Sequence, residues 1–217
     1  MGRLVGITAG AVALAIAAFA WSAQSGAAVE PAETPEKSAE KPGADDAIGI
    51  FAGGCFWCIE ADFEKLEGVR EAISGYTGGT VDNPTYKQVS YEDTGHYEAV
   101  QVYYDPEVVT YRELVDYFFR HVDPLDAGGQ FCDRGASYRT AIFPISPEQR
   151  ADAEASKAEA EKTLGETVVT PVIDASKFWI AEGYHQDYAK NNPLRYRLYR
   201  TNCGRDRRVA QVWAGKS

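Results

Sequence analysis

A strand-to-helix turn with two glycines and two cysteines constrains the fold more than any other feature. The apolar run at residues 47–52 (AIGIFA) has the length of a buried strand, and GGCFWC follows at residues 53–58. Two consecutive glycines let the chain turn sharply where the strand ends. Apolar spacing then predicts a helix over residues 56–66, with Gly68 as its stop. Cys55 is therefore expected at a helix N-terminus, where free amides and the helix dipole favour a thiolate.

The rest of the chain predicts an alternation of strands and helices. This order favours an α+β fold, a two-layer α/β sandwich with a mixed sheet, over a regular doubly wound sheet. We expect a single domain with long irregular loops, and a C-terminal tail from about residue 191. Further strands are predicted at residues 69–76, 97–104, 138–145 and 168–173, helices at 110–122, 147–164 and 181–190, and long loops at 77–95 and 123–135.

The first 46 residues differ in composition from the remainder. An apolar run at residues 4–20 follows Arg3 and precedes small residues, which predicts a secretory signal peptide within residues 1–27. An uncleaved membrane anchor is the alternative, because ~17 apolar residues are close to the minimum for a span. Residues 28–46 are rich in Pro, Ala, Glu and Lys and predict a flexible linker. The catalytic domain is expected over residues 47–217 of an exported, periplasmic or otherwise extracytoplasmic protein.

Charge excludes one class of partner and predicts one contact. With 22 basic and 32 acidic residues the net charge is −10, which argues against nucleic-acid binding. From Lys190 onward, however, eight basic residues and one acid give +7. This basic segment should be drawn onto the acidic body of the domain.

The cysteines leave several chemical interpretations. Four in 217 residues are too few for a disulfide-stapled scaffold. Cys55 and Cys58 form a C-x-x-C pair, which suits a thioredoxin-like dithiol, a nucleophile beside an aromatic pocket, or merely two small buried side chains. A zinc site is disfavoured because Cys132 and Cys203 are isolated and the three histidines are scattered.

Seven sequence blocks in one order resemble peptide methionine sulfoxide reductases of type A. The resemblance extends from about residue 47 into the tail. It implies a two-layer α/β fold and the reduction of methionine S-sulfoxide, free or in proteins, as repair after oxidative stress, without a cofactor or metal. The blocks are GCFW (54–57), GYTGG (75–79), NPTY (83–86), TGHYEAV (94–100), YDP (104–106), FCDRGASYRTAIF (131–143) and YHQDY (184–188).

The resemblance assigns the groups that act on the substrate's sulfur. By motif, Cys55 is the nucleophile, and Phe56 and Trp57 line the pocket for the substrate's methyl group. Attack by the thiolate leaves methionine and a cysteine sulfenic acid, which a second thiol converts to a disulfide. An external dithiol such as thioredoxin then reduces that disulfide.

The same resemblance assigns the groups that act on the oxygen. Glu98 is the acid that binds and protonates it, Tyr86 and Tyr138 donate hydrogen bonds to it, and Asp133 supports the polar site. A sulfoxide oxygen leaves only if it is protonated or strongly hydrogen-bonded. Glu98 meets this need if burial raises its pKa enough to keep it protonated near neutrality.

The second thiol is the part of the pattern that departs from the family. Many members have a glycine-rich tail with two cysteines, whereas this tail has Cys203 alone, flanked by arginines that lower its pKa. We expect Cys203 to be the resolving cysteine. Cys58, one helical turn from Cys55, is the runner-up, and Cys132 is disfavoured by the neighbouring Asp133.

Two other functions stay open at this stage. One is thiol–disulfide exchange through Cys55 and Cys58, and the other is a non-catalytic module that binds oxidised or apolar peptides at Phe56 and Trp57. For the reductase, the expected partners are methionine-sulfoxide-containing proteins, free methionine sulfoxide and a thioredoxin-like reductant. A monomer is expected, with the membrane involved only if residues 4–20 stay as an anchor. Export would require a dedicated reducing partner, because extracytoplasmic compartments favour disulfides.

Overall fold

The computed structural model describes residues 1–2, 43 and 45–216. The predicted signal peptide or anchor and almost all of the predicted linker lie outside these residues. Within the described part of the chain, every helix is too short or too polar to cross a bilayer.

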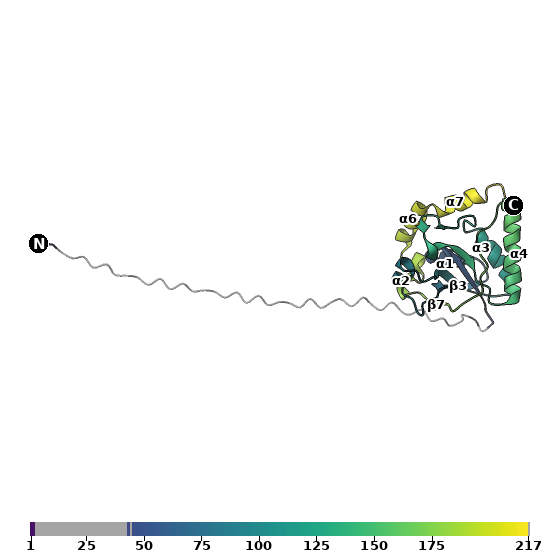
Figure 1. The fold of residues 1–217 in the computed structure, drawn as a ribbon, viewed down its shortest axis with the longest axis horizontal. Coiled ribbons are helices and arrows are strands. Elements are labelled where there is room, and N and C mark those ends of the chain that lie inside the picture. The colour runs from purple at the N-terminus through teal and green to yellow at the C-terminus, as the bar shows by residue number, and fades with distance from the viewer. Residues whose placement is uncertain (3–42, 44, 217) are drawn as a thin grey trace. The chain divides into compact units, whose positions relative to one another are not determined.

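A five-stranded antiparallel sheet organises the domain (Figure 1). Its order is β6-β1-β3-β2-β7, so that β3 lies at the centre between β1 and β2. The bounds are β1 Ala47–Gly53, β2 Val69–Thr77, β3 Tyr97–Tyr104, β6 Thr140–Ile142 and β7 Trp179–Ile180.

The predicted mixed sheet is corrected by this pairing. All the paired strands described in the sheet are antiparallel, and the predicted strand at residues 168–173 forms only a parallel bridge between Val172 and Ile142. Pro171 lies in that segment and has no N–H to donate to a ladder. The segment therefore joins the sheet edge only through two backbone hydrogen bonds with Ile142, at 3.0 and 2.9 Å.

Three helices begin where the sequence predicts them, one after the glycine turn and two after capping residues. They are α1 Phe56–Phe63, α3 Tyr111–Phe119 and α4 Pro147–Leu164. Thr110 and Glu113 form a capping box at α3, and Ser146 caps α4 before the proline at its first position. Helix starts are thus confirmed, while α1 and α3 end three residues earlier than expected.

The two faces of the sheet are covered differently. Phe51 of β1 packs on the helix side, with ring centroids 4.9 Å from Phe63 and 5.5 Å from Phe118. Ile50, its neighbour in β1, belongs to a smaller cluster against Ile173 and Phe178. Successive side chains of β1 therefore pack on opposite faces of the sheet, as a layered α/β fold requires.

Several short elements appear where loops or other elements were expected. Helix α2 (Tyr86–Tyr91) lies in the predicted loop at 77–95, and the hairpin β4 (Gly129–Gln130) and β5 (Asp133–Arg134) lies in the loop at 123–135. A 3-10 helix, η1 (Ala136–Tyr138), replaces the start of the strand predicted at 138–145.

The helix predicted at 181–190 is also interrupted. It consists of a 3-10 turn, η2 (Gly183–His185), and the short helix α5 (Tyr188–Asn191). Asp187 between them has a φ of 50°, in the left-handed region that an α-helix does not use.

The C-terminal segment is helical, which corrects the expected tail. It forms α6 (Pro193–Cys203) and α7 (Arg205–Val212), which meet at Gly204 with a φ of 75° (yellow in Figure 1). Helix α6 has no fully buried residue, and its two leucines, Leu194 and Leu198, are exposed, so it is not a core helix of the kind that apolar periodicity predicts.

Ion pairs fix this basic segment to the acidic body, as the charge distribution predicts. Arg200 lies 2.9 Å from the buried carboxylate of Asp62 in α1, and Arg208 lies 2.6 Å from Asp123. Arg205 is 2% exposed and donates to the carbonyls of Gly53 and His121, both at 3.1 Å. The hydrogen bond to the Gly53 carbonyl joins Arg205 to the first residue of the glycine turn.

Candidate active site

The turn after β1 requires glycine for two reasons. Gly54 has a φ of 82°, which disfavours any side chain, and a Cβ at this position would lie 2.5 Å from the Cβ of Gln130. The turn delivers Cys55 to the N-cap position of α1, with only 6% of the residue exposed. The predicted strand, turn and helix N-terminus are confirmed.

The aromatic pair after Cys55 forms one wall of the site. Phe56 is buried, and its ring lies 6.4 Å from that of Tyr86. The Trp57 indole stacks on Tyr188 at 3.6 Å and donates its N–H to Nδ1 of His185 at 3.0 Å. Burial lowers the pKa of His185 to about 4, so the imidazole is neutral and can accept this hydrogen bond.

Glu98 lies in the central strand, opposite Tyr76 of β2. It is 2% exposed, and its Oε2 accepts the backbone N–H of Phe56 at 3.0 Å. Burial raises the pKa of Glu98 to about 8, and the nearby charge of Asp133 also raises it, against the hydrogen bonds from Phe56 and Tyr138. The carboxyl group is therefore largely protonated at neutral pH, as the role of proton donor predicted from the sequence requires.

The two predicted tyrosines converge on this carboxyl group. Tyr138, at the end of η1, lies close enough for its hydroxyl to lower the pKa of Glu98 and that of Tyr86, which begins α2. Burial raises the pKa of both phenols, which stay neutral donors. Asp133 of β5 lies beside them, and burial raises the pKa of its carboxyl group. The fold thus brings these four predicted groups to one place beside Cys55.

The cysteines are arranged differently from the expectation for the resolving step. Cys203 forms a disulfide with Cys132, and their Cα atoms are 5.0 Å apart. Cys55 and Cys58 are free and buried. The end of α6 carries Cys203 to the β4–β5 hairpin, so it does not meet Cys55 as a free thiol.

Cys55 and Cys58 share a hydrogen bond, and their ionisation is linked. Burial raises the pKa of Cys55 well above its usual value, and Cys58 and Glu98 raise it further, whereas a hydrogen bond from Tyr199 lowers it. The hydrogen bond from Cys55 lowers the pKa of Cys58 to about 7, with help from Arg205 and against burial. A helix N-terminus alone therefore does not make Cys55 a thiolate.

Sequence reasoning missed two residues at the site. Tyr199 of α6 lies edge-on to Trp57 at 5.9 Å and donates a hydrogen bond to Asp133, but its segment was predicted to be a tail. Glu182 accepts the backbone N–H of Tyr86 at 2.8 Å. The capping pair Thr85 and Gln88 is the sequence signal that would have located α2, and with it Tyr86.

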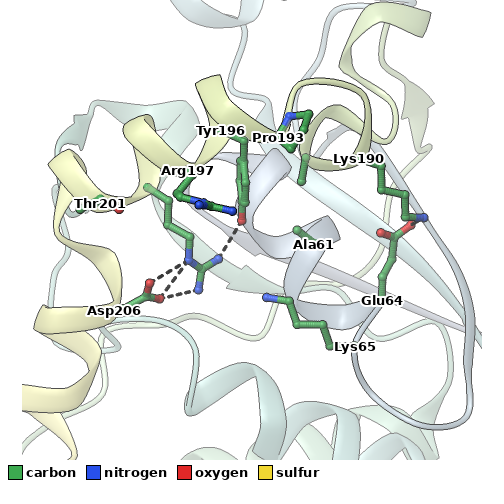
Figure 2. A pocket seen from close by; sticks show the side chains of 11 residues that line it. Ala61, Glu64, Lys65, Lys190, Pro193, Tyr196, Arg197, Thr201 and Asp206 are labelled. Carbon is green, nitrogen blue, oxygen red and sulfur yellow. Dashed lines mark hydrogen bonds and ion pairs between the residues drawn. The ribbon is translucent and has the colours of Figure 1, made fainter.

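A separate cavity of about 620 Å³ lies between α1 and α6 (Figure 2). Charged side chains stand on both sides of it, Glu64 and Lys190 on one and Arg197 and Asp206 on the other. None of the predicted site residues lines it. The candidate site is therefore the enclosed cluster around Cys55, not this open hollow.

Comparison with known proteins identifies the family of this chain. The family model described as peptide methionine sulfoxide reductase matches residues 47–217. Peptide methionine sulfoxide reductase MsrA 2 of Rhizobium meliloti is 52% identical over 174 residues, which cover 80% of this chain and 87% of the relative. MsrA of Bacillus subtilis is 46% identical over 171 residues, which cover 78% of this chain and 97% of the relative.

Solved structures are similar as well. Methionine sulfoxide reductase A of Corynebacterium diphtheriae has a TM-score of 0.67 and 30% identity, and covers 71% of this chain and 78% of its own. Mxr1 of Saccharomyces cerevisiae in complex with Trx2 has a TM-score of 0.51 and 26% identity, and covers 70% of this chain and 91% of its own.

The buried carboxyl group yields a direct prediction. We expect the Glu98 side chain to be protonated at pH 7 and to titrate near pH 8, because burial disfavours its charged form. Carbon-13 NMR of glutamate-labelled protein, with Glu98→Gln to assign the signal, measures this value. A carboxyl group that titrates in the ordinary range near ~4 would contradict it.

Proposed function

Because this chain belongs to the peptide methionine sulfoxide reductase family, type A, and reduces methionine sulfoxide, we propose that it acts on the S epimer, free and within proteins, through Cys55. The observation that carries the proposal is a nearly buried thiol beside a buried, protonated carboxyl group, with two neutral phenols on the same side. Reduction of a sulfoxide needs a thiol to attack the sulfur and, at the same place, an acid and hydrogen-bond donors for the oxygen.

The proposed reaction begins at sulfur. The Cys55 thiolate attacks the positive sulfur of the sulfoxide while the substrate's methyl group lies against Phe56 and Trp57. A proton from Glu98 and hydrogen bonds from Tyr86 and Tyr138 stabilise the negative charge that develops on the oxygen. The S–O bond of the sulfoxide then breaks as the protonated oxygen moves to the Cys55 sulfur, and the temporary S–S bond breaks to release reduced methionine. Cys55 is left as a sulfenic acid, and the proton that its thiol lost returns to Glu98.

The acid distinguishes this reaction from thiol–disulfide exchange. Thiol–disulfide exchange transfers no oxygen, so it needs neither an acid nor hydrogen-bond donors for one. It would not explain why a carboxyl group is buried here at a cost in free energy, with two phenols beside it. A peptide-binding module would likewise need the aromatic wall but not the acid. The protonated Glu98 therefore favours reduction over both alternatives.

We propose that Cys58, not Cys203, first condenses with the sulfenic acid. Cys58 lies one helical turn from Cys55, its backbone N–H is bonded to the Cys55 carbonyl at 3.1 Å, and its thiol is free. Cys203 would need its disulfide with Cys132 to be reduced first. Condensation forms the Cys55–Cys58 bond and releases the oxygen as water.

Thioredoxin is the reductant that we propose for the resulting disulfide. Mxr1, a structural relative, has been solved in complex with Trx2. Two electrons and two protons from such a dithiol return Cys55 and Cys58 to thiols. In this role the enzyme repairs proteins after oxidative stress, and a sequence whose one methionine is Met1 suits an oxidising setting. The monomeric state stays a prediction.

The first test is catalytic. With methionine S-sulfoxide and dithiothreitol, we expect turnover by the parent protein and none by Cys55→Ser. Glu98→Ala should lower kcat by about 100-fold or more, because general acid catalysis contributes on that order. Glu92→Ala, which alters an exposed acid, serves as the matched control. Equal rates for Glu98→Ala and Glu92→Ala would remove the proposed acid, and an inactive parent would favour a binding module.

The second test concerns the resolving thiol. After one equivalent of sulfoxide without reductant, peptide mapping should recover Cys55–Cys58 and an intact Cys132–Cys203 bond. In Cys58→Ser, dimedone should label a persistent sulfenic acid, whereas Cys203→Ser should still form the first disulfide. Recovery of Cys55–Cys203 with Cys132 released would instead restore the assignment that the tail's composition favours.

Export is proposed separately, from the composition of residues 1–27. The apolar run at 4–20 with one preceding arginine supports a signal peptide and a periplasmic location, with the anchor as the alternative. Fractionation of expressing cells should place the protein outside the cytoplasm in a shortened form. A full-length protein in the membrane fraction would indicate the anchor, and a wholly cytoplasmic protein would refute export.

A further inference from the structure

The fold brings two cysteines that are 71 residues apart in the chain to the two oxygens of one carboxyl group. Cys132 is exposed in the turn between β4 and β5, and Cys203 is the last residue of α6. Sγ of Cys132 lies 3.8 Å from Oδ1 of Asp133, and Sγ of Cys203 lies 3.8 Å from Oδ2. The two cysteines are isolated in the sequence, which disfavoured a zinc site, but they are not isolated in the fold.

The three side chains form a donor set that zinc uses. Cysteine thiolates and carboxylates are ordinary ligands of Zn²⁺, and the ligand atoms of these residues all lie within 4.8 Å of one another. With Zn–S of about 2.3 Å and Zn–O of about 2.1 Å, a tetrahedral ion holds a sulfur and an oxygen about 3.6 Å apart. Both sulfur–oxygen distances of 3.8 Å are close to this value.

The two sulfurs are bonded to each other, so a metal ion can bind only after the disulfide is reduced. An external dithiol, the class of reductant proposed for the catalytic cycle, supplies two electrons and two protons and leaves two thiols. A tetrahedral zinc ion needs the two sulfurs about 3.8 Å apart. Cys132 is exposed and Cys203 is half-buried, so the sulfurs have room to separate, and the reductant and the ion can reach them.

Neighbouring groups already orient these ligands. The hydroxyl of Tyr199, one turn before Cys203 on α6, donates to Oδ2 of Asp133, in the way that carboxylate ligands of metal ions are commonly held. The backbone N–H of Cys132 lies 3.2 Å from Sγ of Cys203 and can donate to a thiolate there. Both contacts exist before any metal binds, so part of the ligand geometry is already in place.

We propose that the reduced form of this protein binds one zinc ion through Cys132, Cys203 and Asp133, with water as the fourth ligand. The ion displaces the two thiol protons, and bonds from zinc to the two sulfurs replace the S–S bond. The metal then links α6 to the β4–β5 hairpin when the disulfide no longer does. Zinc binding at this site does not depend on the proposed catalytic steps.

The link matters because α6 also reaches the candidate active site. Tyr199 lies edge-on to Trp57, with ring centroids 5.9 Å apart, and its hydroxyl contacts Asp133. A reductant that opened the Cys132–Cys203 bond would free the end of the helix that carries this tyrosine. The zinc ion would keep that end attached under reducing conditions.

The other dithiol of the chain is the rival zinc site. Cys55 and Cys58 are free thiols with the C-x-x-C spacing that many zinc ligands have. The two residues are only 6% and 2% exposed, however. Among the residues that the structure describes, neither belongs to a group of three or more possible metal ligands. The experiment has to distinguish the two pairs.

The experiment measures zinc retained by untagged protein after reduction with a phosphine, which adds no competing thiol. Free zinc is removed by gel filtration, and we expect about one zinc ion per chain in the reduced protein and none in the oxidised protein. Cobalt in place of zinc should give the visible bands of a tetrahedral site and a sulfur-to-cobalt charge-transfer band, which identify thiolate ligands. Zinc should also raise the melting temperature of the reduced protein, because it binds the folded form more tightly.

Matched variants assign the ligands. Cys132→Ser combined with Cys203→Ser should abolish zinc binding, whereas Cys55→Ser combined with Cys58→Ser should retain it. Asp133→Asn should weaken zinc binding by about tenfold or more, because an amide carries no negative charge for the ion.

A second pair of variants tests the group that orients the carboxylate. Tyr199→Phe should weaken zinc binding by about 10- to 100-fold, which is the usual effect of removing a hydrogen bond to a metal ligand. Tyr196→Phe is its control, because the Tyr196 hydroxyl lies on the same helix but bonds to Arg200 at the open hollow of Figure 2. This variant should bind zinc as the parent does.

Two results would overturn the proposed site. One is a reduced parent that retains no zinc, whether or not circular dichroism shows it to be folded. The other is zinc retained by Cys132→Ser with Cys203→Ser but lost from Cys55→Ser with Cys58→Ser, which would assign the metal to the buried pair. The measurement needs no sulfoxide, so a parent without reductase activity would refute the proposed function and leave this result unaffected.

Discussion

The hydrogen bond from the Phe56 amide to the Glu98 carboxyl group is the contact on which the site depends. It joins the first turn of α1 to the central strand of the sheet, and so places an acid beside the residue that follows the glycine turn. A charged carboxylate at this depth would be costly, and the raised pKa of Glu98 avoids that cost by retaining a proton. The same burial that defines the fold thus produces the acid that the reaction needs.

The C-terminal helices are part of the catalytic structure rather than an appendage. Arg200 pairs with the buried Asp62 of α1, and Arg205 donates to the carbonyl of Gly53 directly below the turn. Arg205 also lowers the pKa of Cys58, and Tyr199 lowers that of Cys55. Because the segment changes the pKa of both thiols, its side chains influence chemistry that occurs in another part of the chain.

Local signals made part of this structure predictable from sequence. The caps at Thr110 and Ser146 located two helices, since capping depends on neighbouring residues alone. The glycine pair located the turn, and the family blocks supplied Cys55 and Glu98. The net charge of the tail correctly predicted its contact with the acidic body.

Features that depend on distant residues were not predictable in this way. Helix α6 turns no apolar face into the core, because its leucines Leu194 and Leu198 are exposed, and an ion pair ties it to α1, so periodicity gave no indication of it. The pairing of Cys132 with Cys203 spans 71 residues and has two equally valid alternatives among four cysteines. The prediction of a thiolate at Cys55 likewise left burial out of account. Burial raises the pKa of this thiol, against the effect expected of a helix N-terminus.

The pH dependence of a single turnover tests the central claim most directly. One equivalent of the S-sulfoxide is supplied without reductant, and the methionine released is measured. This amount reports only the steps from attack at the sulfoxide sulfur to formation of the sulfenic acid. If Glu98 supplies the proton, the rate constant at saturating sulfoxide should fall as pH rises through about 8, and Glu98→Gln should lose this upper limb together with most of the rate. A rate that persists unchanged well above pH 8 in the parent, or a Glu98→Gln variant as fast as the parent, would contradict the account.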